Sequence, residues 1–161
     1  MTHVLLPVTL LLRRAYLAEL IFSALEGRAC GDGHRRIAAR SGVPASTVRG
    51  WIRAMTGRVE AVRSWFLGIA VTAGVDVRIP KATGTGCGDV VAAIAVAAAA
   101  VVDRFGGGGF VGGVTVSAVA VVGSGGRLLA PGWPSSVGFD SPTPVGSDAG
   151  GGGARSSDST V

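Results

Sequence analysis

One helical face in the first third of the chain carries groups that could read nucleic-acid bases. Its members recur at i, i+3, i+4 and i+7, the spacing of one side of a helix: Ser46, Arg49, Gly50 and Arg53. An arginine on such a face can donate two hydrogen bonds to one guanine, which discriminates against other bases by roughly 1–3 kcal/mol. Gly50 costs a helix about 1 kcal/mol of propensity. That cost makes sense if the backbone must approach DNA closely.

A helix-turn-helix would position this face. The pattern predicts a first helix at His34–Ser41, a turn at Gly42, and a second, recognition helix at about Ala45–Met55. A small residue is expected where the helices cross, glycine at the turn, and apolar residues where the pair packs on a preceding helix. These structural positions are Ile37, Ala38, Gly42, Val43, Val48, Trp51 and Ile52. Ser41 departs from the pattern, because a larger apolar residue is usual there.

The charge of this window has one sign. Six arginines and no acid lie between Gly33 and Arg58, and residues 1–64 carry a net charge of +6 against −1 for residues 65–161. Fourteen of the 15 basic residues are arginine, which also fits the codon bias of a GC-rich genome, so a helical domain with incidental arginines stays an alternative. Phosphate contacts, which position a protein without specifying sequence, are expected from Arg35, Arg36, Arg40, Thr47 and Arg58.

Four stretches resemble a family of actinobacterial helix-turn-helix proteins that are transposase-like and homeodomain-like: Thr2–Pro7, Gly33–Arg40, Pro44–Trp51 and Gly126–Pro134. The resemblance implies double-stranded DNA binding, in transcription regulation or with mobile elements, and no established catalytic activity. Family members carry a cysteine-rich, zinc-ribbon-like segment before the first stretch. Because this chain starts at that stretch, we expect a truncated relative or an upstream start, and zinc is not carried over.

The expected fold is mainly α, with an N-terminal three- to four-helix bundle, then an Ala/Val-rich helix and Gly-rich, largely disordered C-terminal segments. A first helix is predicted at about Arg14–Arg28 from the stripe Leu17, Leu20, Ile21, Ala24 and Leu25, and a fourth from Val59 to about Ala70. The expected divisions are a DNA-binding domain at 1–70, a linker at 71–88, a low-complexity helical region at 89–133 and a disordered tail at 134–161.

The second half of the chain is apolar but glycine-rich, with 21 of the 27 glycines after residue 64. A helix is predicted at Asp89–Phe105, whereas Val114–Val122 fits a helix or a strand. The apolar run Val90–Val102 is shorter than the roughly 20 residues that span a bilayer. Near the N-terminus, arginines follow an apolar run instead of preceding it, which is wrong for a signal peptide. We therefore expect a cytoplasmic, nucleoid-associated protein with no membrane partner.

Two rival functions remain at this point. Gly84–Asp89 before a helix resembles the anion hole of sugar and pyrimidine kinases, but neither the length nor alternating strands support that fold. The helical domain could instead be a non-catalytic protein-interaction module without DNA affinity.

No catalytic constellation, cofactor, metal site or small-molecule substrate is expected, because Cys30, Cys87 and the two histidines lack ligand-type partners. A lone module would bind non-specific DNA only at roughly 10⁻⁴–10⁻⁶ M, so a homodimer or a second DNA-contacting element is expected.

Overall fold

The structure is a computed structural model that describes residues 8–74, 76–106 and 113–134, with side chains from Tyr16 onward. The mainly helical fold is confirmed. Pro134 apart, the expected disordered tail lies outside the described residues. The described helices are α1 (Val8–Ala29), α2 (His34–Ser41), α3 (Ala45–Thr56), α4 (Val59–Ala73), α5 (Gly86–Phe105) and α6 (Val116–Gly123).

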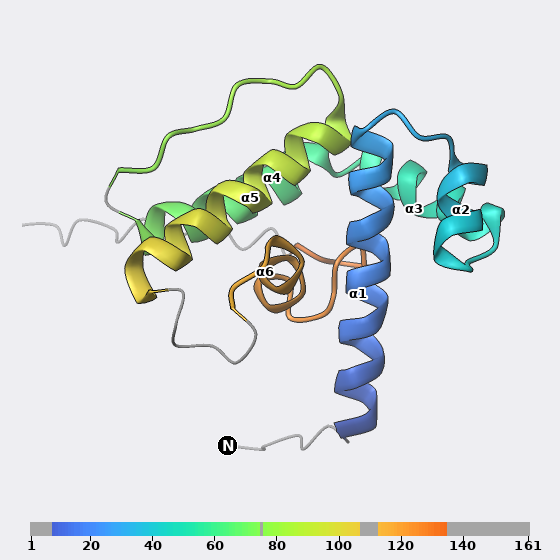
Figure 1. Ribbon diagram of the computed structural model, residues 1–161, viewed down its shortest axis with the longest axis horizontal. Coiled ribbons are helices and arrows are strands. Elements are labelled where there is room, and N and C mark those ends of the chain that lie inside the picture. Colours follow the sequence, from blue (N-terminus) through green and yellow to red (C-terminus); the bar gives the residue numbers. More distant parts are fainter. Residues whose placement is uncertain (1–7, 75, 107–112, 135–161) are drawn as a thin grey trace, which may run out of the picture.

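The long helix α1 stands between two groups of helices (Figure 1). On one side it contacts the short pair α2 and α3, and on the other it contacts α5 and α6. Two hydrophobic clusters result, one on each side of α1. Ala24 belongs to the smaller cluster with α2 and α3, whereas Ala18, Ile21, Phe22 and Leu25 belong to the main core.

Helices α4 and α5 lie side by side and run in the same direction (Figure 1). Gly86 at the start of α5 lies against Val59 at the start of α4, and Gly74 just after α4 lies against Ala100 near the end of α5. Two parallel neighbours require a connection that returns along their length, as crossover connections in helical bundles do. The extended segment after α4 makes this return.

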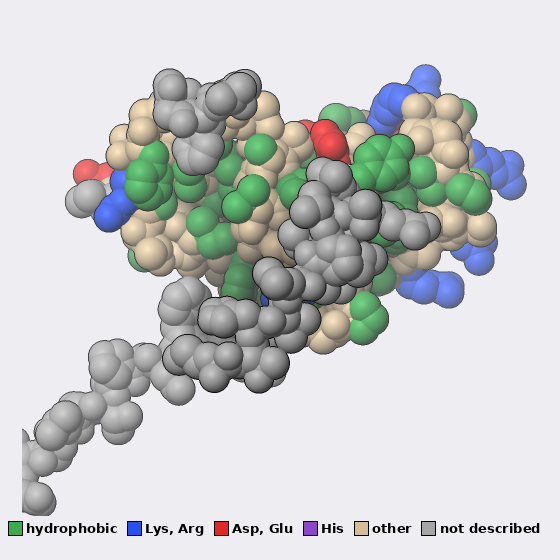
Figure 2. Space-filling model, turned by 90° about the horizontal axis from the view of Figure 1, so that it is seen from below, with side chains coloured by type: hydrophobic (Ala, Val, Ile, Leu, Met, Phe, Trp, Pro, Cys, Tyr) green, Lys and Arg blue, Asp and Glu red, His purple; other side chains and the backbone are tan. Residues whose placement is uncertain are grey.

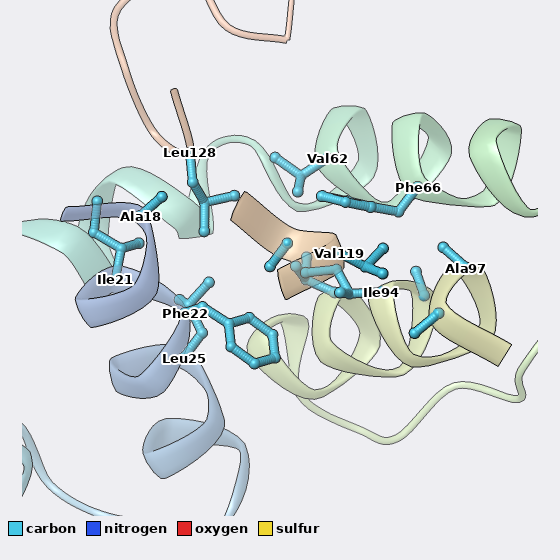
Figure 3. Close-up of a cluster of buried hydrophobic side chains, with 14 of the residues drawn as sticks. Ala18, Ile21, Phe22, Leu25, Val62, Phe66, Ile94, Ala97, Val119 and Leu128 are labelled. Atoms are coloured by element: carbon cyan, nitrogen blue, oxygen red, sulfur yellow. The ribbon is translucent and has the colours of Figure 1, made fainter. Parts of the chain in front are cut away.

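The main core joins residues of α1, α3, α4, α5 and α6 and of the segment after α6, and Figure 3 shows a part of it. Helix α5 contributes a stripe at i, i+3, i+4 and i+7, and every member has no exposed surface: Val90, Ala93, Ile94 and Ala97. Phe66 of α4 and Leu128 beyond α6 face the same centre. Because residues from 18 to 133 share this core, the packing does not change at residue 70, where the sequence composition does.

Three expectations about elements need correction or completion. The buried stripe of α1 includes Ala18 and Phe22, while Leu17 is 44% exposed, because α1 packs on two sides instead of one. Helix α5 begins three residues earlier than predicted, at Gly86, since the Thr85 side chain accepts a hydrogen bond from Gly88 N and caps it. For Val114–Val122 the sequence fitted either a helix or a strand, and the structure has a helix there, α6.

One described helix, α5, is long and apolar enough to cross a membrane. In its most apolar window, 44% of the residues are buried inside the protein. Its buried stripe forms the middle of the main core, and the core helix of a globular protein passes the same test of length and composition. We therefore assign α5 to the protein core.

Candidate nucleic-acid interface

The turn between α2 and α3 depends on the backbone of Gly42. Its φ of 67° lies in the left-handed region, where glycine adopts the C-cap conformation without the cost that a side chain would bring. A Cβ at Gly42 would meet no atom within 4 Å, so the requirement is conformational and not steric. Just before it, the half-buried Ser41 donates from Oγ to the carbonyl of Ile37 at 2.9 Å, which satisfies this unusual polar residue within its own helix.

The helix pair packs on α1 through a small cluster. Ile37, Ala38 and Val48 are buried against Ala24 of α1. Val43, Trp51 and Ile52 are partly buried around them. Trp51 also packs against the main core, so this side chain connects the two clusters. The orientation of α3 is therefore tied to the rest of the protein.

The opposite face of α3 is open to solvent. Every member of the predicted reading face is exposed: Ser46, Arg49, Gly50 and Arg53. A Cβ at Gly50 would meet nothing within 4 Å, so no contact within the protein requires glycine at this position. A helix that includes an exposed glycine gives up about 1 kcal/mol of propensity. Nothing in the described part of the chain explains glycine at this position.

Basic side chains gather at the end of the molecule formed by α2 and α3 (Figure 2). Arg35 and Thr47 are exposed, as phosphate contacts require. Arg36 and Arg40 also extend into solvent, but both pair with Asp32 just before α2, at 3.3 Å and 2.9 Å. Exposed ion pairs contribute little energy, so these two arginines can exchange the carboxylate for another anion.

Arg58 differs from its expected role as a phosphate contact. Its guanidinium is partly buried and points back into the protein, where Nη1 donates to three carbonyl oxygens. These belong to Leu129 at 3.3 Å, Ala130 at 2.9 Å and Trp133 at 3.2 Å. The acceptors lie 71 to 75 positions along the chain, so no local pattern could have predicted the contact. The structure gives Arg58 an internal partner.

The first turns of α2 and α3 lack side-chain caps and acidic residues. Gly33 and Pro44 occupy the two N-cap positions, and neither offers a side-chain oxygen. The backbone N–H groups at a helix N-terminus, together with the helix dipole, favour an anion. Both helix starts are thus open to phosphate oxygens beside the exposed arginines.

Two residues of this region escaped the sequence argument. Gly27 lies inside α1, where a Cβ would be 3.1 Å from Ile37 Cγ1 and against the Arg40 guanidinium, so it permits the close approach of α1 and α2. The sequence feature that could have identified Gly27 is a glycine inside a predicted helix, because such a glycine often permits close packing. Asp32 orients Arg36 and Arg40, and it was the one acid immediately before the arginine-rich window.

Backbone conformation and close contacts within the protein account for the glycines of Thr83–Asp89. Gly84 has a φ of 87°, a Cβ at Gly86 would be 2.7 Å from Val59 Cγ2, and one at Gly88 would collide with the Thr83 and Thr85 hydroxyls. Asp89 accepts hydrogen bonds from the backbone N and the Oγ1 of Thr83, and the backbone bond is the main cause of its lowered pKa. A carboxylate held in its ionised form is a weak general base.

No group of three or more His, Cys, Asp or Glu that could hold a metal ion occurs among the described residues. Cys87 is buried, which raises the pKa of its thiol, and Cys30 is exposed. Both are free cysteines. His34 opens α2 and is half-buried. The chemistry gathered around α2 and α3 is therefore that of arginine side chains and helix N-termini.

Comparison of the chain with protein-family profiles, curated proteins and solved structures gives no match. The case for a function therefore depends on the geometry and charge of the chain itself.

Proposed function

We propose that the protein binds double-stranded DNA through α2 and α3, with α3 in the major groove, as a transcriptional regulator or a mobile-element-associated protein. The observation that carries the proposal is the charge on the exposed side of the pair. Helices α2 and α3 contain no acid and five exposed arginines: Arg35, Arg36, Arg40, Arg49 and Arg53. Asp32, just before α2, offsets part of this charge through its pairs with Arg36 and Arg40. The arginines still outnumber it, and such an excess of basic charge is the electrostatic footprint of nucleic-acid binding.

The arrangement of the pair supports a division of roles. Arg49 and Arg53 lie one turn apart on the exposed side of α3, where a helix in the major groove meets base edges. Arg35, Arg36 and Arg40 lie on α2, the helix that crosses the backbone in this motif. Because a lone module of this size binds DNA weakly, the proposal includes a second copy or a second DNA-contacting element. It also places the protein with the nucleoid in the cytoplasm.

Fluorescence anisotropy with duplex DNA at 50 and 200 mM salt tests the proposal. With three phosphate contacts, affinity should fall about 40-fold between these two concentrations, because counterions are released on binding. Changing Arg49 and Arg53 together to alanine should lower affinity at least about tenfold, since each base contact contributes roughly 1–3 kcal/mol.

The matched control is Arg78→Ala with Lys81→Ala. It removes the same charge from exposed positions in the segment between α4 and α5, and it should lose far less affinity than the α3 double variant. Equal losses in the two double variants would mean that α3 contributes only net charge. Absence of affinity in the wild-type protein at 50 mM salt would overturn the proposal.

A protein-interaction module is the second candidate, and exposed apolar side chains favour it. Phe105 is 61% exposed and Val122 is 78% exposed. Val122 lines an apolar pocket of about 190 Å³ together with residues of α4, α5 and α6, among them Ile69, Val101 and Val119. This surface belongs to a different part of the protein from the basic face. A module of this kind would show no salt-dependent DNA affinity, so the same titration separates the candidates.

A further inference from the structure

Residues 124–134, here called the C-terminal segment, dock against the joint between α3 and α4. Leu128 is 2% exposed and Trp133 is 4% exposed, and both belong to the main core. The Trp133 ring meets Trp65 and Phe66 of α4 edge to face, with ring centroids 6.0 and 6.3 Å apart. The Trp65 Nε1 donates to the carbonyl of Gly123 at 2.9 Å, just before the segment begins. The segment is therefore packed, although its sequence is rich in turn residues.

The segment presents its backbone to Arg58. Successive turns hold it, with Ala130 N bonded to Arg127 O at 2.7 Å and Trp133 N bonded to Ala130 O at 3.1 Å. Leu129 has a φ of 63°, a left-handed conformation that non-glycine residues rarely adopt. Such strain persists only where the surroundings over-determine it. Here three carbonyls converge on one guanidinium nitrogen.

Arg58 stands at the joint that sets the direction of the recognition helix. It is the N-cap of α4 and follows the end of α3 by two residues. Its backbone N donates to Met55 O of α3 at 2.8 Å, and its carbonyl accepts from Val62 N of α4 at 3.0 Å. A side chain that anchors this residue to the C-terminal segment therefore also anchors the end of α3.

We propose that Arg58 is a positioning residue: it clamps the C-terminal segment onto the α3–α4 joint and so holds α3 at the angle that DNA binding requires. The inference depends on the proposed DNA-binding function. The C-terminal segment, about 70 positions away in sequence, then becomes part of the DNA-binding unit. Arg58 itself touches no phosphate, although it is a basic residue next to the recognition helix.

The salt dependence of DNA binding separates positioning from phosphate contact. Arg58→Ala should lower affinity on the order of tenfold, about 1.4 kcal/mol, with the slope of log K against log salt unchanged. Loss of a true phosphate contact would reduce that slope by about 0.9, as Arg35→Ala is expected to do. Trp133→Phe is the second variant, because it loosens the segment without removing a charge, and it should also lower affinity at unchanged slope.

The rate of tryptic cleavage after Arg127 measures how firmly Arg58 holds the C-terminal segment in place, and this measurement does not require DNA. Arg127 is exposed but the next residue, Leu128, is buried, so cleavage requires release of the segment. Arg58→Ala should speed this cleavage at least about tenfold, which corresponds to about 1.4 kcal/mol. Arg58→Lys should largely restore protection, because an ammonium also donates to several carbonyls.

Five outcomes decide the inference. A lower affinity at unchanged slope, together with faster cleavage and rescue by lysine, supports it. Unchanged cleavage in Arg58→Ala overturns the clamp, and a slope reduced by about 0.9 assigns Arg58 to a phosphate. If Arg58→Ala and Trp133→Phe both bind DNA with the affinity of the wild type, the positioning role is overturned. Wild-type protein without DNA affinity overturns the proposed function and with it the positioning role, while cleavage still reports the clamp.

Discussion

Gly42 and Gly50 are both exposed glycines of the α2–α3 pair, and neither has a neighbour that a Cβ would meet. Their backbones nevertheless differ. Gly42 has a φ of 67° and ends α2, whereas Gly50 lies within α3. Substitution by alanine therefore has opposite consequences for folding at the two positions.

Gly50→Ala should raise the free energy of unfolding by about 0.5–1 kcal/mol, because alanine is the better helix former and loses less entropy on folding. The same change should lower DNA affinity if the backbone of α3 approaches the groove. Urea denaturation and the anisotropy titration measure the two effects. A variant that is more stable and binds DNA as well as the wild type would remove Gly50 from the interface.

The matched control is Gly42→Ala, which forces a side chain into the left-handed region. It should lower the free energy of unfolding by about 1–2 kcal/mol. The same denaturation series measures it. A neutral Gly42→Ala would mean that the turn between α2 and α3 does not need its observed backbone conformation.

At the scale of elements, the start of α5 combines several local signals. Thr85 caps the helix, and the Asp89 carboxylate lies in its first turn, where the helix dipole favours an anion. The backbone N–H of Thr83 is the largest cause of the lowered Asp89 pKa, and the Thr83 hydroxyl adds to it. The glycines of this stretch are thus part of a helix start that packs against α4.

Asp89→Asn should destabilise the protein at neutral pH and lose this effect in acid. Because folding lowers the Asp89 pKa below its ordinary value of 3.8, the carboxylate stabilises the folded state at pH values above 3.8. That contribution is lost as pH falls further and the folded protein takes up the proton. Urea denaturation at pH 7 and at about pH 3 should therefore give a difference between wild type and variant that narrows in acid.

The control is Asp103→Asn, which makes the same change in the last turn of α5. There the helix dipole disfavours an acid, so this variant should be neutral or slightly more stable at pH 7. A destabilisation by Asp89→Asn that does not change with pH would contradict the role assigned to its charge.

At the scale of the whole molecule, the two halves that differ in composition share one core. Phe22 and Leu25 of α1 pack with residues of α4 and α5 and with Val119 of α6 (Figure 3). A protein built this way should unfold cooperatively, with the α2–α3 pair and the Ala/Val-rich helix α5 melting together. The glycine-rich second half is then required for the stability of the first.

Ile94→Ala tests this shared core from the second half of the chain. Ile94 has no exposed surface, so the truncation should lower the free energy of unfolding by about 2–5 kcal/mol. Circular dichroism and tryptophan fluorescence should shift together along one denaturation curve, because Trp51 packs against both clusters. Ala99→Ser on the exposed side of α5 is the control and should change stability by less than about 0.5 kcal/mol. A separate transition that Ile94→Ala leaves unmoved would indicate independent halves.

The sequence by itself determined α2, α3, α4 and the exposed face of α3, whereas it left Val114–Val122 open between helix and strand and placed the start of α1 at about Arg14 instead of Val8. Period 3.6 in apolar residues and a glycine that ends a helix are local properties, so His34–Ser41 was predicted with its observed bounds, and α3 and α4 to within a few residues. Tertiary structure decided the parallel pairing of α4 with α5, the second buried side of α1 and the direction of Arg58. These features depend on contacts between residues far apart in sequence, such as the one from Arg58 to Ala130, 72 positions apart. Such contacts are set by how the whole chain packs, so local periodicity does not predict them.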